Sequence, residues 1–150
     1  MICPKCFHGK TTIYNSRKQK TTNSTWRRHS CPACGLQFTT IEQVDPSLLQ
    51  VLYADGSSAS FNFPTLLLSI TKSCQHLGLN NDAYHLSETI TAKLLRKHKA
   101  LAVSRDAICQ TALETLERYD SQAYLSYLAV HGNIKSRLDI KAALKKNQKR

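Results

Sequence analysis

The stretch that decides the fold is Cys3-Pro4-Lys5-Cys6, which is matched, after 24 intervening residues, by Cys31-Pro32-Ala33-Cys34-Gly35. Two intervening residues let the backbone turn so that both thiolates of a pair face one ion. Two such pairs offer four sulfurs in the tetrahedral arrangement of structural Zn²⁺, at about 2.3 Å per bond. Gly35 permits the left-handed conformation that such a turn often needs. We therefore expect one Zn²⁺ bound by Cys3, Cys6, Cys31 and Cys34.

Two other uses of paired cysteines remain open at this point, namely a redox dithiol and an iron–sulfur centre. Four sulfurs close the coordination shell, so the metal is expected to be structural and not catalytic. His8 and His29 lie near the pairs and, with four cysteines available, are expected at the surface. Cys74 and Cys109 fall on apolar faces of expected helices and are interpreted as small buried hydrophobic residues.

The composition changes near residues 44–47, after four of the six cysteines and the single Trp. We place a zinc-ribbon domain at residues 1–45, a second domain at 49–131, and a basic helix or tail at 132–150. The first part has few aliphatic residues, so we expect the metal to supply most of its folding free energy. The basic tail either adds nonspecific DNA affinity or is simply solvated.

Local signals predict an α+β protein, with a small ribbon of antiparallel strands followed by a mostly helical domain. β-branched and aromatic residues predict strands at 11–14 and 36–41, and the polar residues 18–25 are expected to form a flexible loop or to order on binding. Asp55-Gly56 predicts the turn of a β-hairpin that opens the second domain. Apolar spacings predict helices over 63–77 and 82–98. Ser104 is expected to cap a third helix, and a fourth begins near Ser121.

The chain is strongly basic, with 21 Lys+Arg against 10 Asp+Glu and a net charge of +11. The charge is densest per residue in the cysteine-bearing part, which favours a nucleic-acid partner over a charge that only solvates the protein. Trp26 is expected either to contact DNA or to cover the ribbon's core. The residues expected to contact double-stranded DNA lie between the cysteine pairs: Arg17, Lys18, Trp26, Arg27, Arg28 and His29.

The sequence contains no run of 18 apolar residues, and its first residues lack the apolar core of a signal peptide. We therefore expect no membrane span and a cytoplasmic location, at the nucleoid when the protein is bound to DNA. A reducing compartment favours metal-bound cysteines over disulfides. No constellation of acid, base and nucleophile is recognisable, so the protein is not expected to be an enzyme.

These motifs resemble the NrdR family, the bacterial transcriptional repressors of ribonucleotide reductase genes. Members typically read Cys-Pro-x-Cys near the start, then Asp-Ser-Arg, an arginine run, and Cys-x-x-Cys-x-x-x-Phe-Thr-Thr-x-Glu. Besides the cysteine pairs, this chain has Asn15-Ser16-Arg17, Trp26-Arg27-Arg28-His29 and Phe38-Thr39-Thr40-Ile41-Glu42. Asn15 replaces the usual acid, and Trp26 and His29 interrupt the arginine run. The resemblance implies a zinc ribbon that binds promoter DNA.

The resemblance also implies that residues 49–131 form an ATP-cone, a mostly helical module that binds ATP or dATP. The family's motifs are roughly Val-x-Lys-Arg-Asp-Gly, then Phe and a Lys-Leu pair, and later Ala-Tyr-x-Arg-Phe. Tyr53, Thr65 and Ser126 stand where these motifs have basic residues, so the cone is divergent. The nucleotide-binding residues implied by the motifs are Val51, Asp55, Gly56 and Tyr124.

Losing cations that pair with a triphosphate removes charge-assisted contacts. Three alternatives follow. Nucleotide binding could persist through other cations, it could be weak, or it could be absent, which would leave the cone as an oligomerisation platform. The other cations are Lys72, Lys93, Arg96, Lys97 and Lys99. The hypothesis is a zinc-dependent repressor of ribonucleotide reductase genes that forms homo-oligomers modulated by ATP or dATP. The alternative is a zinc-ribbon interaction module, or an accessory subunit of a nucleic-acid machine, whose cone binds no nucleotide.

Overall fold

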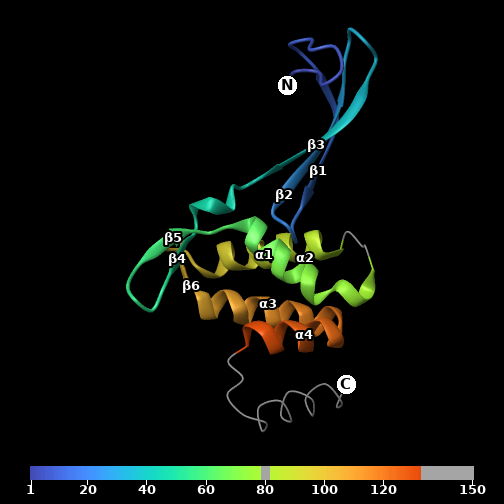
Figure 1. The fold of residues 1–150 in the computed structure, drawn as a ribbon. Helices are drawn as coiled ribbons and strands as arrows, with labels where there is room; N and C mark the ends of the chain where they lie inside the picture. Colours follow the sequence, from blue (N-terminus) through green and yellow to red (C-terminus); the bar gives the residue numbers. More distant parts are fainter. Residues whose placement is uncertain (79–81, 133–150) are drawn as a thin grey trace. The chain divides into compact units, whose positions relative to one another are not determined.

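The computed structural model describes residues 1–78 and 82–132. The chain divides into two compact units, Met1–Asp45 and Pro46–Arg150 (Figure 1). The first unit is an antiparallel sheet with a cluster of four cysteines, and the second is mostly helical, which confirms the α+β prediction. Within the described part of the chain, no helix combines the length and the apolar character needed to cross a membrane. The basic C-terminal tail lies, from residue 133 onward, outside the described residues.

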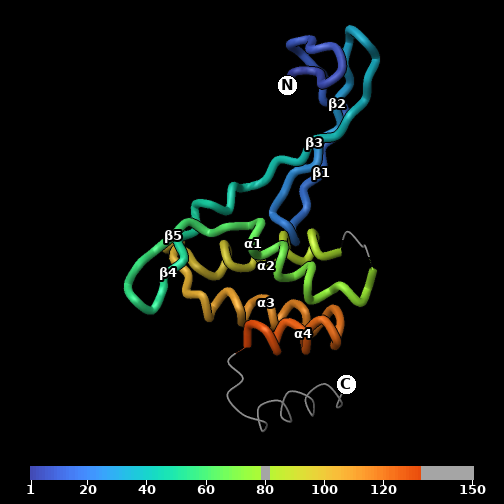
Figure 2. The backbone as a smooth tube through the Cα atoms, viewed as in Figure 1, coloured from blue at the N-terminus to red at the C-terminus, as the bar shows by residue number. Residues whose placement is uncertain are grey.

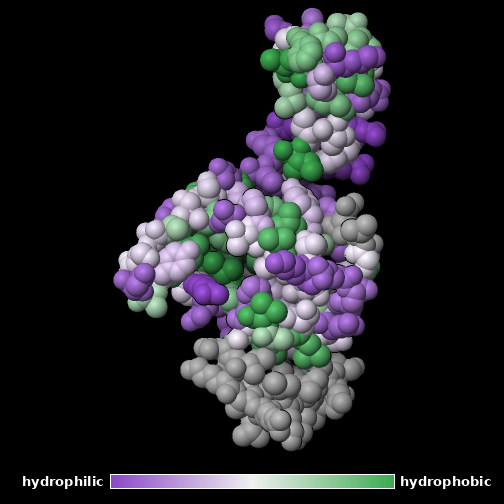
Figure 3. All heavy atoms as spheres, viewed as in Figure 1, coloured by the Kyte–Doolittle hydropathy of each residue, from purple (hydrophilic) through white to green (hydrophobic). Residues whose placement is uncertain are grey.

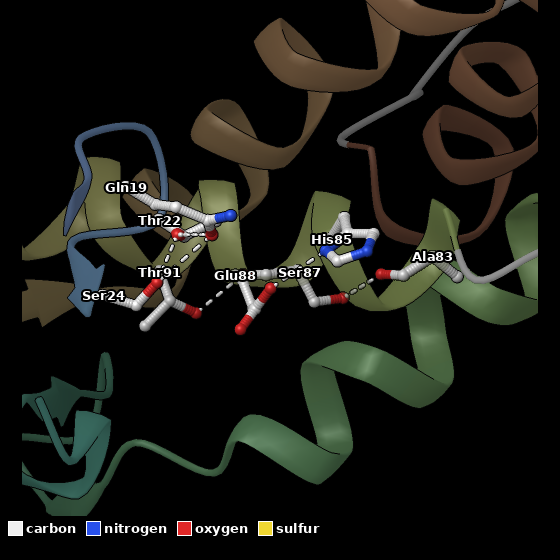
Figure 4. A network of polar contacts seen from close by, with 8 residues as sticks. All are labelled: Gln19, Thr22, Ser24, Ala83, His85, Ser87, Glu88 and Thr91. Carbon is white, nitrogen blue, oxygen red and sulfur yellow. Dashed lines mark hydrogen bonds and ion pairs between the residues drawn. The ribbon is translucent and has the colours of Figure 1, made fainter. Parts of the chain in front are cut away.

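The first unit contains a three-stranded sheet in the order β1-β2-β3, with β1 (Thr12–Gln19), β2 (Ser24–Ser30) and β3 (Gln37–Gln43) (Figure 2). In the turn between β1 and β2, the hydroxyls of Thr22 and Ser24 donate to Oε1 of Gln19 at 3.3 and 3.4 Å (Figure 4). The loop predicted at residues 18–25 is therefore wrong at both ends, where β1 and β2 extend, and a turn remains at residues 20–23. Backbone pairing between strands holds this hairpin, so it needs no apolar residue of its own.

Four helices build most of the second unit: α1 (Phe63–Ser73), α2 (Asp82–Lys97), α3 (Arg105–Tyr119) and α4 (Ser121–His131). Side chains cap three of them, because Asn62, Ser104 and Asp120 accept hydrogen bonds from the backbone N–H groups three residues later. The predicted Ser104 cap and the helix start near Ser121 are confirmed. The first helix ends earlier than predicted, and a 3-10 turn, η2 (Gln75–Leu77), leads to Gly78 at φ +81°.

A short sheet completes the second unit after a 3-10 turn, η1 (Pro46–Leu48): β4 (Gln50–Leu52), β5 (Ser58–Ser60) and β6 (Ala102–Ser104), in the order β5-β4-β6. β4 and β5 form the predicted hairpin, in which Gly56 has φ +83° and the Asp55 carboxylate accepts from the Ser57 N–H at 2.9 Å. β6 runs parallel to β4 and was not predicted. Its three residues carry no local signal and pair with a strand far back in the chain.

The second unit has a large apolar core to which all four helices and the sheet contribute. Polar side chains inside the helices are satisfied locally: on α2, the hydroxyls of Ser87 and Thr91 donate to the carbonyls of Ala83 and Ser87 at 2.8 Å each (Figure 4). The residues whose side chains are most completely buried include Leu49, Ile70, Ile90, Leu94, Val103 and Leu116.

Candidate metal centre, nucleic-acid face and ligand cavity

The cysteine pairs of the first unit bring four sulfur atoms within 4.8 Å of one another. The Sγ atoms of Cys3 and Cys34 are 3.7 Å apart, and those of Cys6 and Cys31 are 3.6 Å apart. A Zn²⁺ tetrahedron with bonds of about 2.3 Å has edges of about 3.8 Å. The observed separations fit that geometry and exceed the disulfide bond length of about 2.05 Å. The cluster is therefore a site that suits Zn²⁺.

Both cysteine turns use the same backbone design. In the first, the Cys3 N–H donates to the carbonyl of His8 and the Phe7 N–H to the carbonyl of Cys3, each at 3.0 Å. In the second, the N–H groups of Cys31 and Gly35 donate to the carbonyls of Leu36 and Cys31, each at 2.9 Å. The fourth residue after the first cysteine is left-handed in both turns, with φ +56° at Phe7 and +71° at Gly35.

The thiols of the cluster are not equivalent. The backbone N–H of Cys6, in particular, lowers the pKa of the Cys3 thiol to about 6. At Cys6 the backbone N–H of His8 acts in the same direction, but burial and the three neighbouring cysteines raise the pKa to about 12. Sulfurs packed this closely do not all ionise without a counter-charge, which a divalent cation bound among them provides.

His29 lies in the core of the ribbon and not at its surface. Its Nδ1 is 3.2 Å from the Thr11 hydroxyl and its Nε2 is 2.9 Å from the Thr40 hydroxyl, so both ring nitrogens have partners. The ring stacks on Phe38 with centroids 5.0 Å apart, and the residue is 4% exposed. The surface prediction for His29 is therefore wrong, because pairing across the sheet encloses the ring.

The strand register separates the basic residues into two sets. Directly opposite residues of an antiparallel sheet share a face, and Trp26 is opposite both Arg17 and Ile41. Arg28, two residues further along β2, lies on the same face. We call Arg17, Trp26, Arg28 and Ile41 the tryptophan face. The opposite face, which we call the histidine face, carries Lys18, Arg27, His29 and Glu42.

The two faces differ in how their cations are paired. On the histidine face, the Arg27 guanidinium forms an ion pair with Glu42. On the tryptophan face, the Arg28 guanidinium lies 5.6 Å from the centre of the Trp26 ring, within range of a cation–π contact. Neither Arg28 nor Arg17 forms an ion pair with a carboxylate in the part of the chain that the structure describes. Both are exposed, as is Ile41.

A cavity of about 420 Å³ lies in the second unit between the β4–β5 hairpin and helices α1, α3 and α4. Arg105, the first residue of α3, is the one Lys or Arg among its described lining residues, and no lining residue is acidic. His131 also lines the cavity, and burial, Arg105 and Lys72 lower its pKa. Tyr127 lies against it, with a pKa raised to about 12 by burial. The cavity thus combines an apolar wall with a single strong cation.

The residues implied by the ATP-cone motifs are only partly gathered at this cavity. Val51 lines it, together with Tyr53 and Thr65, but Asp55 and Gly56 form the exposed hairpin turn and Tyr124 is buried in the core. None of the five alternative cations lines it. Three of those five are bound elsewhere: Lys93 donates to the Thr115 hydroxyl at 2.7 Å, Arg96 donates to the carbonyl of Ala92 at 3.2 Å, and Lys97 pairs with Glu114.

Sequence reasoning missed Arg105, Tyr127 and His131 at the cavity. Arg105 directly follows the Ser104 cap, which fixes its position at the start of α3, and this is the only local signal that pointed to it. Cys109, expected to be buried, is half-buried and lines the cavity, whereas Cys74 is buried as predicted.

Comparisons with known proteins agree with the metal centre. A family model described as "Transcriptional repressor NrdR-like, N-terminal domain" matches residues 1–42. The transcriptional repressor NrdR of Bacillus mycoides is 30% identical over 138 residues, which cover 90% of this chain and 88% of the relative. That of Microcystis aeruginosa is 29% identical over 144 residues, covering 96% and 84%, and that of Chlamydia felis is 30% identical over 136 residues, covering 90% and 88%.

These relatives match both units of the chain and not the ribbon alone, since the aligned residues extend well past Asp45. The zinc-ribbon model matches only residues 1–42, and it agrees with the relatives over the first unit. The chain therefore belongs to the NrdR family, which is a family of transcriptional repressors and not of enzymes.

Proposed function

We propose that the protein is a zinc-dependent repressor that binds double-stranded promoter DNA through the tryptophan face of its ribbon. Zn²⁺ bound by Cys3, Cys6, Cys31 and Cys34 would fix the ends of the sheet and so preorganise the cations on it. The observation that carries the proposal is the pairing difference between neighbouring arginines: Arg27 is neutralised by Glu42, whereas Arg28 is exposed beside Trp26. An unpaired guanidinium can bind a phosphate or a guanine edge.

The matched pair of variants is Arg28→Ala and Arg27→Ala, which remove the same charge from opposite faces of one strand. DNA affinity would be measured by fluorescence anisotropy over a range of salt concentrations. Arg28→Ala is expected to weaken binding about tenfold or more and to lower the salt slope by about one, as for one lost phosphate contact. Arg27→Ala is expected to change affinity much less. Equal losses in both variants would contradict the assignment of the face.

We further place the targets at promoters of ribonucleotide reductase genes, in the bacterial cytoplasm, because this is what the family resemblance implies. A ribbon this small makes few base contacts, so a homo-oligomer engaging paired sites is the expected binding form. Promoter DNA and a scrambled duplex of equal length would be compared at physiological salt. Equal affinity for both would contradict sequence-specific repression and favour the alternative function, a zinc-ribbon interaction module.

The second unit is proposed to bind ATP or dATP weakly in the 420 Å³ cavity and to adjust oligomeric state accordingly. Supporting this, Val51 lines the cavity and Arg105 offers a cation without a carboxylate partner among the described residues. The fit to a triphosphate is partial, since Tyr53 and Thr65 supply no charge where the family motifs have lysines. A nucleotide acts as a switch only if it binds one assembly better than another.

Calorimetry with ATP and dATP, run beside size-exclusion chromatography, tests this part. We expect weak binding that Arg105→Ala reduces further, and a change in elution volume with saturating nucleotide. The control variant is Lys97→Ala, which removes a cation that pairs with Glu114 and does not line the cavity. No heat and no change in assembly would leave the second unit as an oligomerisation platform only.

A further inference from the structure

Phe7 occupies a backbone position that its residue type disfavours. It is left-handed at φ +56°, and Gly35 takes the equivalent place in the second cysteine turn at φ +71°. A side chain with a Cβ atom is strained in this region, and a bulky one without a local hydrogen bond is uncommon there. The turn itself therefore calls for a glycine, as the second turn shows.

Burial does not compensate for that conformation. Phe7 is 78% exposed, which makes it the most exposed large hydrophobic residue among those described. An exposed ring contributes little to the stability of the ribbon, because the hydrophobic effect depends on area removed from water. Neither the local geometry nor the packing of the free protein thus accounts for a phenylalanine at this position.

The surroundings of Phe7 indicate what could bind it. Residues 1–41 contain seven Lys and Arg and no Asp or Glu. Lys5 and Lys10 flank Phe7 in sequence and are exposed, and so is Ile2. In the space-filling view, hydrophobic and hydrophilic atoms lie side by side at the end of the unit that carries the cysteine turns (Figure 3). An apolar ring beside exposed lysines complements a nucleic acid, which offers bases beside phosphates.

We propose that Phe7 is a DNA-contacting residue whose ring packs against a base or sugar of the duplex, while Lys5 and Lys10 bind phosphates. This inference rests on the proposed DNA-binding function and extends the contact surface from the sheet to the first cysteine turn. Phenylalanine side chains can contact thymine methyl groups or wedge between base steps. Such a contact would account for an exposed phenylalanine at a backbone position that favours glycine.

The test uses the full-length zinc-loaded protein and three substitutions. Phe7→Gly relieves the backbone and removes the ring, Phe7→Ala removes the ring alone, and Phe7→Tyr keeps an aromatic ring. Phe7→Gly is expected to raise the thermal midpoint of the ribbon and yet to weaken promoter DNA binding about tenfold, within the range for base–aromatic contacts. Phe7→Ala should weaken binding equally without that gain in stability. Phe7→Tyr should stay within about threefold of the wild type.

The salt dependence separates this contact from a phosphate contact. Since Phe7 is uncharged, the slope of log affinity against log salt should be unchanged in Phe7→Gly, whereas Arg28→Ala lowers it. Wild-type affinity in Phe7→Gly, or a loss that follows from lost zinc or a lower midpoint, would overturn the inference. So would a changed oligomeric state with unchanged DNA affinity, which would point to a protein contact. If the wild type itself binds no DNA, the proposed function fails first.

Discussion

The two units are held together by different forces. In the first, the only buried hydrophobic residues among those described are Cys3 and Cys31, both ligands of the candidate metal site. In the second, aliphatic and aromatic side chains from four helices and a sheet are buried in one cluster. A unit of this size without buried Leu, Ile, Val or Phe does not gain enough from apolar burial to fold alone. Within one chain, the ribbon thus depends on a metal ion for its fold and the helical unit on an apolar core.

Removing the metal should produce the largest effect and should be confined to the first unit. Binding of structural Zn²⁺ contributes about 10–16 kcal/mol in comparable small domains. This exceeds the free energy of unfolding expected for a ribbon of this size, so the ribbon should unfold without the metal. We expect Cys31→Ser, or a strong chelator, to abolish the strand signal of residues 12–43 and DNA binding while the helices remain. Zinc analysis with far-UV circular dichroism and NMR measures this. A ribbon that keeps its fold without metal would show that the two units do not differ in what stabilises them.

Weakening the apolar core should affect only the second unit. Ile90 on α2 is fully buried, and its replacement by Ala should lower the free energy of unfolding by about 2–5 kcal/mol through lost burial and a cavity. Leu68→Ala on α1 is the control, because Leu68 is 57% exposed and should cost at most about 0.5 kcal/mol. Urea unfolding followed by helix signal gives both values. Zinc stoichiometry should be unchanged in both variants.

The features that could be predicted from the sequence are those with local causes. The cysteine turns follow from the two residues between the cysteines, and the second turn also from Gly35. The hairpin follows from Asp55-Gly56, and the α3 start from Ser104. The sequence also predicted the metal-binding cluster, because four thiols at this spacing have few other uses.

The features that escaped prediction depend on pairing between distant residues. The loop predicted at residues 18–25 overlaps the end of β1 and the first two residues of β2, and the sequence predicts neither the rest of β2 nor β6. Both β2 and β6 acquire their structure from a partner strand. The split of Arg27 and Arg28 between opposite faces follows from the register, which the sequence does not state. For the same reason His29 was expected at the surface, and Arg105 was not connected with a cavity whose walls come from five elements.

A substitution of His29 tests whether the histidine face belongs to the fold or to the DNA surface. His29→Ala removes the hydrogen bonds of the ring to the hydroxyls of Thr11 and Thr40 and its stacking on Phe38, so the ribbon should lose about 1–3 kcal/mol. The measurement is the chelator concentration or temperature at which the strand signal disappears. DNA affinity of the folded, zinc-loaded fraction should match that of the wild type. A loss of affinity at unchanged stability would show His29 to be a DNA contact.

The smallest effect concerns a helix cap in the second unit. The Asp120 carboxylate accepts from the Ala123 N–H at 2.7 Å, and its Oδ1 is 2.8 Å from Nε2 of His76. Asp120→Ala should cost about 1 kcal/mol at neutral pH. Asp120→Asn keeps a capping oxygen without the charge, so it should lose less. Urea unfolding of the three proteins across a pH series would measure these differences.

The pH dependence tests whether the charge of the Asp120 carboxylate stabilises the cap. The backbone N–H of Ala123, and then His76, lower the pKa of the Asp120 carboxyl in the folded protein. A lowered pKa stabilises the fold above the unfolded value of about 3.9, and that contribution disappears as falling pH protonates the folded carboxyl. The difference in free energy of unfolding between wild type and Asp120→Ala should therefore be largest at pH 7 and disappear in acid. Zinc binding should not affect this difference. A difference that is independent of pH would mean that the carboxylate charge contributes nothing to the cap.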